Sequence, residues 1–423
     1  MKLALIGENI EYSLSPKIHN IFFEDLGIKD TYDIVNIPKE NFDKFMSKDI
    51  YEYNGINVTI PYKQEVLKYL DVVSDTAQTL NSVNTICVVG GKLYGYNTDI
   101  IGFSNMMDFE EISFYNKDVV ILGTGATASM VEFYAIKRKA KSIVFVSRKK
   151  IEDTNDKIYK TYDEDFQGDI LINTTPCGVL GKDESSPISE DVAKKFKVLV
   201  DVNYSLFRNK FLQYGIFNNK KVISGLYMLV SQGIEAEKLF GNVSDTKKKA
   251  REIYIKMMKE KNIVVIGLTG AGKSTISKVL AKSLNKCFYD LDKIIISNEN
   301  KSIEELFQIS EEYFRKCESE NLYKILNEKN AIISTGGGVI LKEENMYEIY
   351  KNSIVIEIKR DVKDIVSTIS LRNRPQLVGD TEEKLKDIYE HRKKLYKKYA
   401  EYSFKNFEIK NTVKTIIYSI KGL

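Results

Sequence analysis

The stretch VVIGLTGAGKSTISKVL, Val264–Leu280, decides the fold of the second half of the chain. Its segment Gly267–Ser274 fits the pattern G-x-x-x-x-G-K-[ST], with a short apolar run before it and a helical pattern after it. Glycines let backbone N–H groups converge on phosphate oxygens, and the N-terminus of the following helix adds positive potential. The stretch therefore predicts a nucleoside triphosphate site at the end of a strand in an α/β domain.

Each residue type in this loop has a task in phosphate binding. Lys273 would reach the β- and γ-phosphates, and the Ser274 hydroxyl would bind Mg²⁺. Asp290, which follows a predicted strand, is the second candidate magnesium ligand. The alternative is a glycine-rich turn that binds nothing. The residues that would contact ATP are Gly270, Ala271, Gly272, Lys273, Ser274 and Thr275.

Length and composition limit the remaining possibilities. The chain has 423 residues, 43% of them hydrophobic, which is enough for two or three domains. A net charge of +4 gives no indication of nucleic-acid binding. The four cysteines lack metal-ligand spacing and are typical of reduced thiols in a cytoplasmic protein. We expect the N-terminus to be an opening strand rather than a signal peptide, and we expect no membrane span.

Apolar runs alternate with helical patterns along the chain, which predicts α/β domains with largely parallel sheets. The predicted strands are residues 2–7, 55–60, 118–123, 142–147, 169–175, 198–203, 262–267, 331–337 and 353–358. Ser244–Lys261 predicts one amphipathic helix with Ser244 as its cap.

A second glycine-rich turn lies in DVVILGTGATASM, residues 118–130. It resembles a loosened dinucleotide fingerprint, and the alternative is a tight packing turn between strand and helix. The next predicted strand ends in Ser147-Arg148-Lys149-Lys150, and a basic cluster there suits a 2′-phosphate, which favours NADP over NAD. The candidate cofactor residues are Gly123, Gly125, Ala126, Thr127, Ala128, Arg148 and Lys149.

The residues downstream of the first loop follow the order of a kinase family. FYDLD carries Asp290 and Asp292, EYFRKCE carries Arg315 and Glu318, STGGGV carries three glycines, and LRNRPQL and EHRKKLY carry further arginines. From Ile263 onward this order resembles shikimate kinase. The resemblance implies that Asp292 orients the accepting hydroxyl, with Lys273 and Arg374 at the transferring phosphate. The substrate-binding residues that it implies are Arg315, Gly336, Gly337, Gly338 and Arg392.

The first half of the chain follows another family. The segments ENIEYSLSPKIHN, GINVTIPYKQEV, NSVNTI, GYNTDIIGF, NTTPCG, VDVNYS and GLYMLVSQG resemble shikimate dehydrogenase, from Met1 to about Met258. The resemblance implies a catalytic pair of Lys63 and Asp99, and it puts Gly225 near the nicotinamide. A lysine can supply the proton that ketone reduction needs, with a carboxylate to orient it. The implied substrate-binding residues are Ser13, Ser15, Thr59, Asn84, Tyr204 and Gln232.

Together the resemblances imply an enzyme with two consecutive activities and small-molecule substrates. NADPH would reduce 3-dehydroshikimate to shikimate, and Mg-ATP would phosphorylate shikimate at its 3-hydroxyl. One alternative is a quinate-type dehydrogenase joined to another hydroxy-acid kinase, and a second is a regulator that binds nucleotides without turnover. The sequence does not define the oligomeric state.

The implied fold is a three-part α/β arrangement. Residues 1–102 would form the dehydrogenase substrate domain, and residues 103–224 a Rossmann NADP-binding domain. Residues 225–259 would return as helices to the substrate domain. Residues 260–423 would form a P-loop kinase domain with three α/β/α layers around a parallel sheet.

Overall fold

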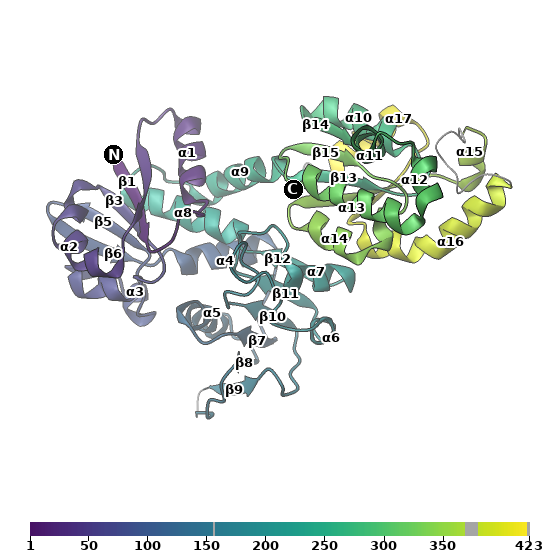
Figure 1. The fold of residues 1–423 in the computed structure, drawn as a ribbon. Helices are drawn as coiled ribbons and strands as arrows, with labels where there is room; N and C mark the ends of the chain where they lie inside the picture. The colour runs from purple at the N-terminus through teal and green to yellow at the C-terminus, as the bar shows by residue number, and fades with distance from the viewer. Residues whose placement is uncertain (155–156, 369–379, 421–423) are drawn as a thin grey trace. The chain divides into compact units, whose positions relative to one another are not determined.

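The computed structural model describes residues 1–154, 157–368 and 380–420 (Figure 1). The chain divides into two compact units. The first comprises Met1–Gly215 and Lys220–Tyr254, and the second comprises Ile216–Asn219 and Ile255–Leu423.

The first unit begins with a mixed six-stranded sheet in the order β2-β1-β3-β5-β6-β4. Strands β1, β2 and β3 run parallel, whereas β5 is antiparallel to both β3 and β6. Its core is a cluster of aromatic and aliphatic side chains that includes Phe42 and Tyr62, whose rings stack 3.9 Å apart. The strands are β1 Lys2–Gly7, β2 Thr31–Asn36, β3 Gly55–Val58, β4 Val72–Val73, β5 Thr85–Val89 and β6 Lys92–Tyr96.

The second sheet of the first unit is parallel throughout, in the order β12-β11-β10-β7-β8-β9. The chain moves from β7 outward to β9 and then returns to β10 on the other side of β7. The carboxyl end of β7 is therefore the topological switch point, where open α/β sheets bind their ligands. The strands are β7 Asp118–Leu122, β8 Ser142–Ser147, β9 Ile158–Thr161, β10 Ile170–Asn173, β11 Val198–Asp201 and β12 Lys221–Ser224.

Two long helices of the first unit, α4 and α8, pack closely against each other. A Cβ at Gly102 would lie 2.6 Å from the Met228 carbonyl oxygen, so only glycine allows this approach. The Asn105 side chain also donates to the Ser231 hydroxyl at 2.9 Å. The helices before β13 are α1 Ser15–Leu26, α2 Phe42–Ser47, α3 Asp75–Thr79, α4 Asp99–Phe109, α5 Ala126–Lys137, α6 Glu190–Ala193, α7 Lys210–Phe217, α8 Leu226–Phe240 and α9 Thr246–Lys259.

The second unit contains a parallel five-stranded sheet in the order β14-β15-β13-β16-β17. Figure 1 shows α10 and α17 on one face and α13, α14 and α16 on the other. Strands β13 and β15 are buried along their whole length because both faces are covered. The strands are β13 Asn262–Ile266, β14 Cys287–Asp290, β15 Ala331–Ser334, β16 Ser353–Lys359 and β17 Tyr402–Lys405. The helices are α10 Lys273–Leu284, α11 Leu291–Glu299, α12 Ile303–Ile309, α13 Glu311–Leu326, α14 Glu343–Tyr350, α15 Val362–Val366, α16 Thr381–Tyr399 and α17 Ile409–Ile420.

The architecture confirms the predicted α/β class, with two differences of detail. The first sheet is mixed, because a short hairpin joins β5 to β6 and β5 also pairs antiparallel with β3. The predicted cap Ser244 is wrong, since the Asp245 carboxylate accepts from the Lys248 amide at 3.1 Å and α9 begins at Thr246.

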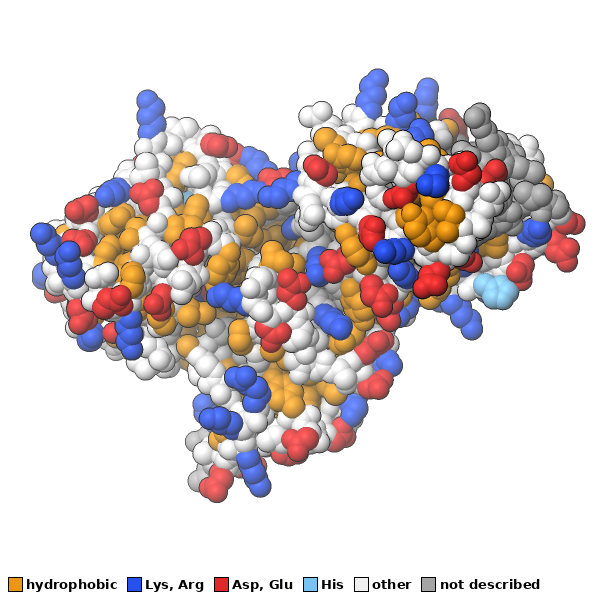
Figure 2. Space-filling view, in the orientation of Figure 1, with side chains coloured by type: hydrophobic (Ala, Val, Ile, Leu, Met, Phe, Trp, Pro, Cys, Tyr) orange, Lys and Arg blue, Asp and Glu red, His pale blue; other side chains and the backbone are white. Residues whose placement is uncertain are grey.

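The surface agrees with the balanced composition. On the face drawn in Figure 2, Lys and Arg side chains are interspersed with Asp and Glu side chains. Among the described residues, no helix has the length and apolar character needed to cross a membrane.

Candidate active sites

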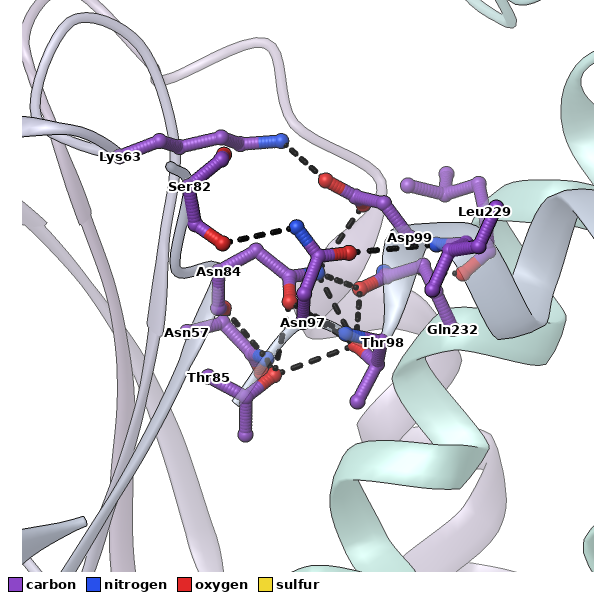
Figure 3. Close-up of polar contacts among 11 residues, drawn as sticks. Asn57, Lys63, Ser82, Asn84, Thr85, Asn97, Thr98, Asp99, Leu229 and Gln232 are labelled. Carbon is purple, nitrogen blue, oxygen red and sulfur yellow. Dashed lines mark hydrogen bonds and ion pairs between the residues drawn. The ribbon is translucent and has the colours of Figure 1, made fainter. Parts of the chain in front are cut away.

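The predicted pair Lys63 and Asp99 is brought together in the first unit. Lys63 follows the turn after β3, and Asp99 is the first residue of α4. Lys63 Nζ donates to Asp99 Oδ2 at 2.6 Å, and the two side chains are 25% and 17% exposed (Figure 3). Asp99 lies at the N-terminus of α4, and its carboxylate holds the Lys63 ammonium in place. The pair is thus a positioned proton donor that solvent and a ligand can still reach.

Asn84 connects this pair to α8. Its side-chain amide donates to Asp99 Oδ1 at 3.0 Å and to Gln232 Oε1 at 3.1 Å (Figure 3). Its own oxygen accepts from the Thr98 amide at 2.6 Å. Three predicted residues from distant parts of the sequence therefore meet at one point, and both Asn84 and Gln232 are buried.

The predicted serines lie in the same unit, before and within the first turn of α1. Ser13 Oγ donates to Ser15 Oγ at 3.2 Å and also accepts from the Ser15 amide. Burial raises the pKa of Tyr204 to about 12, partly offset by a hydrogen bond with Ser13. Tyr204 thus stays a neutral hydroxyl beside the serines. These hydroxyls and the amide at the start of a helix suit a carboxylate ligand.

Tyr32 is a residue that the sequence reasoning missed. Its hydroxyl donates to Asn57 Oδ1 at 2.7 Å, and Asn57 donates to Thr85 Oγ1 at 3.1 Å. Burial, together with the Glu237 carboxylate, raises the pKa of Tyr32 well above its ordinary value, and the residue also hydrogen-bonds Ser15. It lies on β2 in a run without any motif, so no local signal could have identified it.

Predicted Thr59 lies just after β3, with its methyl group against Gly7.

The predicted dinucleotide turn lies at the switch point. Gly123 follows β7 with φ 106°, a left-handed conformation that favours glycine. Gly125 is the N-cap of α5 with no side-chain cap, and a Cβ there would meet nothing within 4 Å. The first-turn residues Ala126, Thr127 and Ala128 therefore present backbone amides beside open space, which fits a pyrophosphate.

The basic cluster lies beside that turn. Strand β8 pairs with β7 in parallel, with Leu122 opposite Val146, so Arg148 and Lys149 follow the neighbouring strand end and are exposed. This position fits a ribose phosphate. Gly225, the N-cap of α8, is packed tightly, since a Cβ would lie 2.2 Å from the Val202 carbonyl oxygen.

In the second unit, the loop between β13 and α10 has the predicted form. Gly270 and Gly272 adopt φ values of 85° and 96°. Lys273 is the first residue of α10, and its Nζ donates to the carbonyl oxygens of Gly267 at 2.9 Å and Leu268 at 3.1 Å. The ammonium group is thus held inside the loop, as the binding of phosphates requires. Ala271 lies between the two glycines, and Thr275 lies in the first turn of α10.

The candidate magnesium ligands are one hydroxyl and one carboxylate. Ser274 Oγ lies 3.2 Å from Ser334 Oγ, and Asp290 ends β14 and caps α11 by accepting from the Lys293 amide at 3.4 Å. No cluster of three His, Cys, Asp or Glu side chains that could hold a metal occurs in the described part of the chain. This set fits Mg²⁺, which protein sites typically hold through one or two ligands, with phosphates and waters completing the coordination.

The predicted acceptor residues converge on the glycine triplet after β15. A Cβ at Gly336 would lie 3.0 Å from Asp292 Oδ1, and a Cβ at Gly338 would lie 2.4 Å from two Arg315 nitrogens. Arg392 Nη1 donates to the Gly337 carbonyl oxygen at 3.1 Å. One carboxylate and two guanidinium groups from three helices therefore surround this backbone. Predicted Arg374 lies outside the described residues.

Glu318 has no role in the predicted site, yet the structure places it there. Its Oε2 accepts from Arg315 Nη1 at 2.7 Å. Its buried Oε1 has no hydrogen-bond partner among the described residues and would lie 2.8 Å from a Cβ at Gly336. Burial raises the pKa of Glu318, and the Arg315 charge opposes that rise. Its spacing of three residues from Arg315 in a helical pattern was the available signal.

Comparisons with known proteins agree with this geometry. The model of the shikimate dehydrogenase substrate binding domain matches residues 5–86, and the model of shikimate kinase matches residues 269–421. Shikimate dehydrogenase (NADP(+)) of Clostridium beijerinckii is 42% identical over 258 residues, which cover 59% of this chain and 96% of that relative.

Solved structures give the same result for the first unit. Shikimate dehydrogenase 1 from Peptoclostridium difficile matches with a TM-score of 0.58 and 34% identity, covering 60% of this chain and 97% of that one. A shikimate dehydrogenase in complex with NADP⁺ matches with a TM-score of 0.53 and 31% identity, over 60% and 95%. The chain therefore belongs to the shikimate dehydrogenase family, and it carries a shikimate kinase domain after the dehydrogenase part.

Proposed function

We propose that the chain is a bifunctional enzyme that catalyses two consecutive reactions. It reduces 3-dehydroshikimate to shikimate with NADPH, and it then phosphorylates shikimate at the 3-hydroxyl with Mg-ATP. The observation that carries the proposal is the Lys63–Asp99 ion pair, joined through Asn84 to Gln232. The buried side-chain amides of Asn84 and Gln232 lie near the partly exposed ammonium of Lys63. Such polar groups suit a polyhydroxylated ketone better than an apolar substrate.

The first reaction needs a proton at the oxygen where negative charge develops. A bound nicotinamide would supply the hydride for the carbonyl carbon, and the Lys63 ammonium would give its proton to the carbonyl oxygen. Asp99 holds that ammonium in place, 2.6 Å away. Ser13, Ser15 and Tyr204 would bind the substrate carboxylate, which fixes the ring relative to Lys63.

The second reaction needs position and charge rather than covalent chemistry. The Asp292 carboxylate would accept or orient the proton of the attacking hydroxyl. Arg315 and Arg392 would bind the substrate carboxylate, because guanidinium groups pair with carboxylates through two hydrogen bonds. Bound Mg-ATP supplies the phosphoryl group, and Lys273 lies where its β- and γ-phosphates would be held.

Three further assignments belong to this proposal. Cofactor preference for NADP rests on Arg148 and Lys149. Residues 1–102 and 225–259 are assigned to the substrate part. Residues 103–224 are assigned to the dinucleotide part, and residues 260–423 to the kinase part. We place the enzyme in the cytoplasm, supported by four cysteines that are all free.

The test compares substrates on the purified chain. NADPH oxidation is followed with 3-dehydroshikimate and with 3-dehydroquinate, and ADP formation is followed with shikimate and with gluconate. We expect turnover with the first compound of each pair. Preference for either second compound would replace the proposed substrates, and nucleotide binding without any turnover would favour a regulator.

Arg148 gives a prediction about the cofactor. Arg148→Ala removes the charged donor for the 2′-phosphate, and we expect KM for NADPH to rise by about tenfold or more, with KM for NADH unchanged. The matched control is Lys141→Ala, an exposed side chain that precedes the same strand β8 at its other end. Equal effects on both cofactors would contradict the assignment.

Glu318 gives a prediction about the acceptor. Glu318→Gln keeps the shape of the side chain but removes its charge, so we expect KM for shikimate to rise by roughly 10- to 100-fold. KM for ATP should not change, because the carboxylate faces the glycine triplet rather than the nucleotide loop. A rise in both KM values together would instead indicate a general loss of structure.

A further inference from the structure

Two adjoining hollows lie in the first unit along α4 and α5, outside both sites described above. Their volumes are about 520 and 540 Å³, within the range of small-molecule pockets. Both are lined by Asp108, Tyr134, Lys137 and Arg138. We treat the two together as the α4–α5 groove.

The groove carries an excess of positive charge. Its described lining contains the cations Lys137, Arg138, Lys139 and Lys247 and the carboxylates Asp108 and Glu111. Arg138 and Lys247 share one carboxylate, at 3.4 Å and 3.5 Å from Asp108. Long, exposed ion pairs of this kind contribute little stability. The chain therefore loses little stability if Arg138 and Lys247 exchange Asp108 for the anionic group of a ligand.

Aromatic rings hold the cationic groups in the groove. The Arg138 guanidinium carbon lies 5.2 Å from the Tyr134 ring centre, and Lys137 Nζ lies 4.3 Å from the Phe133 ring centre. Cation–π contacts limit the motion of these long side chains. The Tyr134 ring is buried in the core, whereas the Phe133 ring is only partly buried and offers apolar surface beside the charges, which suits an anion with a ring body.

The groove touches the two helices that carry the reductase machinery. Helix α4 begins at Asp99, and α5 begins at the dinucleotide turn (Figure 1). Arg138 Nη2 donates to Ser104 Oγ at 3.2 Å and so joins the two helices. A ligand that recruits Arg138 would change this link, and with it the relation of the catalytic carboxylate to the cofactor turn.

We propose that the α4–α5 groove binds a phosphomonoester of a small ring compound and thereby alters the reductase. The formal excess of two positive charges matches a phosphomonoester dianion, and the partly buried ring of Phe133 matches the ring body. The product of the kinase part, shikimate 3-phosphate, has this chemistry. That choice of ligand rests on the proposed function, whereas the binding site itself does not.

The test measures amide hydrogen exchange of the full chain with shikimate 3-phosphate, and with shikimate as the control without a phosphate. At a ligand concentration of ten times Kd, exchange in peptides spanning 104–115 and 133–139 should slow by about tenfold. Shikimate should give no slowing there. Exchange is measured at these peptides because the kinase part is also expected to bind its own product. Slowing at residues 104–115 and 133–139 reports on the groove alone.

Variants make the test specific. Lys137→Ala/Arg138→Ala should raise Kd at these peptides by about tenfold or more, and Lys247→Ala, which removes a side chain 68% exposed, should raise it without disturbing α4. Lys194→Ala/Lys195→Ala removes two exposed cations elsewhere on the unit and should change nothing. Equal slowing by shikimate, no slowing at all, or slowing that survives in the groove variants overturns the proposal. Since exchange needs no turnover, such a result is independent of whether the chain reduces 3-dehydroshikimate.

Discussion

Lys63→Ala is expected to lower kcat for the reduction of 3-dehydroshikimate by roughly 10²- to 10⁴-fold, the usual contribution of a positioned general acid. The ammonium group is the proposed proton donor and lies 2.6 Å from Asp99, and no other described lysine forms an ion pair with that carboxylate. ATP-dependent phosphorylation of added shikimate should stay unchanged, because Lys63 and the phosphate loop lie in separate units.

Two further variants sharpen this result. Lys63→Arg keeps the positive charge, but a guanidinium does not give up its proton at neutral pH, so reduction should stay as low as in the alanine variant. Lys68 is an exposed lysine five residues after Lys63, and Lys68→Ala should leave reduction unchanged. A Lys63→Ala enzyme that reduces its substrate at the normal rate would remove Lys63 from the mechanism.

Asp292→Ala is expected to produce the reverse pattern. Phosphorylation of shikimate should fall by roughly 10²- to 10⁴-fold, since we propose that the carboxylate beside Gly336 positions the attacking hydroxyl. Reduction of 3-dehydroshikimate should be unaffected. The measurement is ADP formation with shikimate at saturating Mg-ATP.

The matched control for Asp292 is another acidic residue in the first turn of a helix. Glu304→Ala in α12 removes a similar interaction with a helix N-terminus but no acceptor group. It should leave both activities intact. If Asp292→Ala abolished reduction as well, in a protein that remains folded, the two sites would not be independent.

The predicted strands match β1, β3, β7, β8, β10, β11, β13, β15 and β16, whereas the predicted ranges do not include β2, β4, β5, β6, β9, β12 and β17. The predicted strand 2–7 is β1, 142–147 is β8, and 353–358 is β16 with one residue more. Predicted strands that ran into glycine or proline ended earlier, as β3 does at Val58 and β15 at Ser334. Apolar runs are a local signal, whereas the strand order and the mixed first sheet depend on which segments pair.

The candidate sites also contain residues that a local motif predicts and residues that only the tertiary structure brings together. The phosphate loop is contiguous, so Lys273 and Ser274 could be predicted from spacing and chemistry alone. Lys63 and Asp99 are separated by 36 residues, and only the family resemblance suggested that they meet. Tyr32 could not be identified, because its part in a site comes from burial and from contacts that only the tertiary structure creates. Glu318 stood out by its spacing from Arg315, but only the structure shows its buried carboxylate beside Gly336.

The most direct test follows one sample of purified chain through both reactions. 3-Dehydroshikimate and NADPH are supplied with and without Mg-ATP, while NADPH oxidation, ADP and product mass are measured. We predict shikimate without Mg-ATP, and shikimate 3-phosphate with equal amounts of NADP⁺ and ADP when Mg-ATP is present. A folded sample that oxidises no NADPH, or that forms shikimate and never phosphorylates it, would contradict the bifunctional assignment.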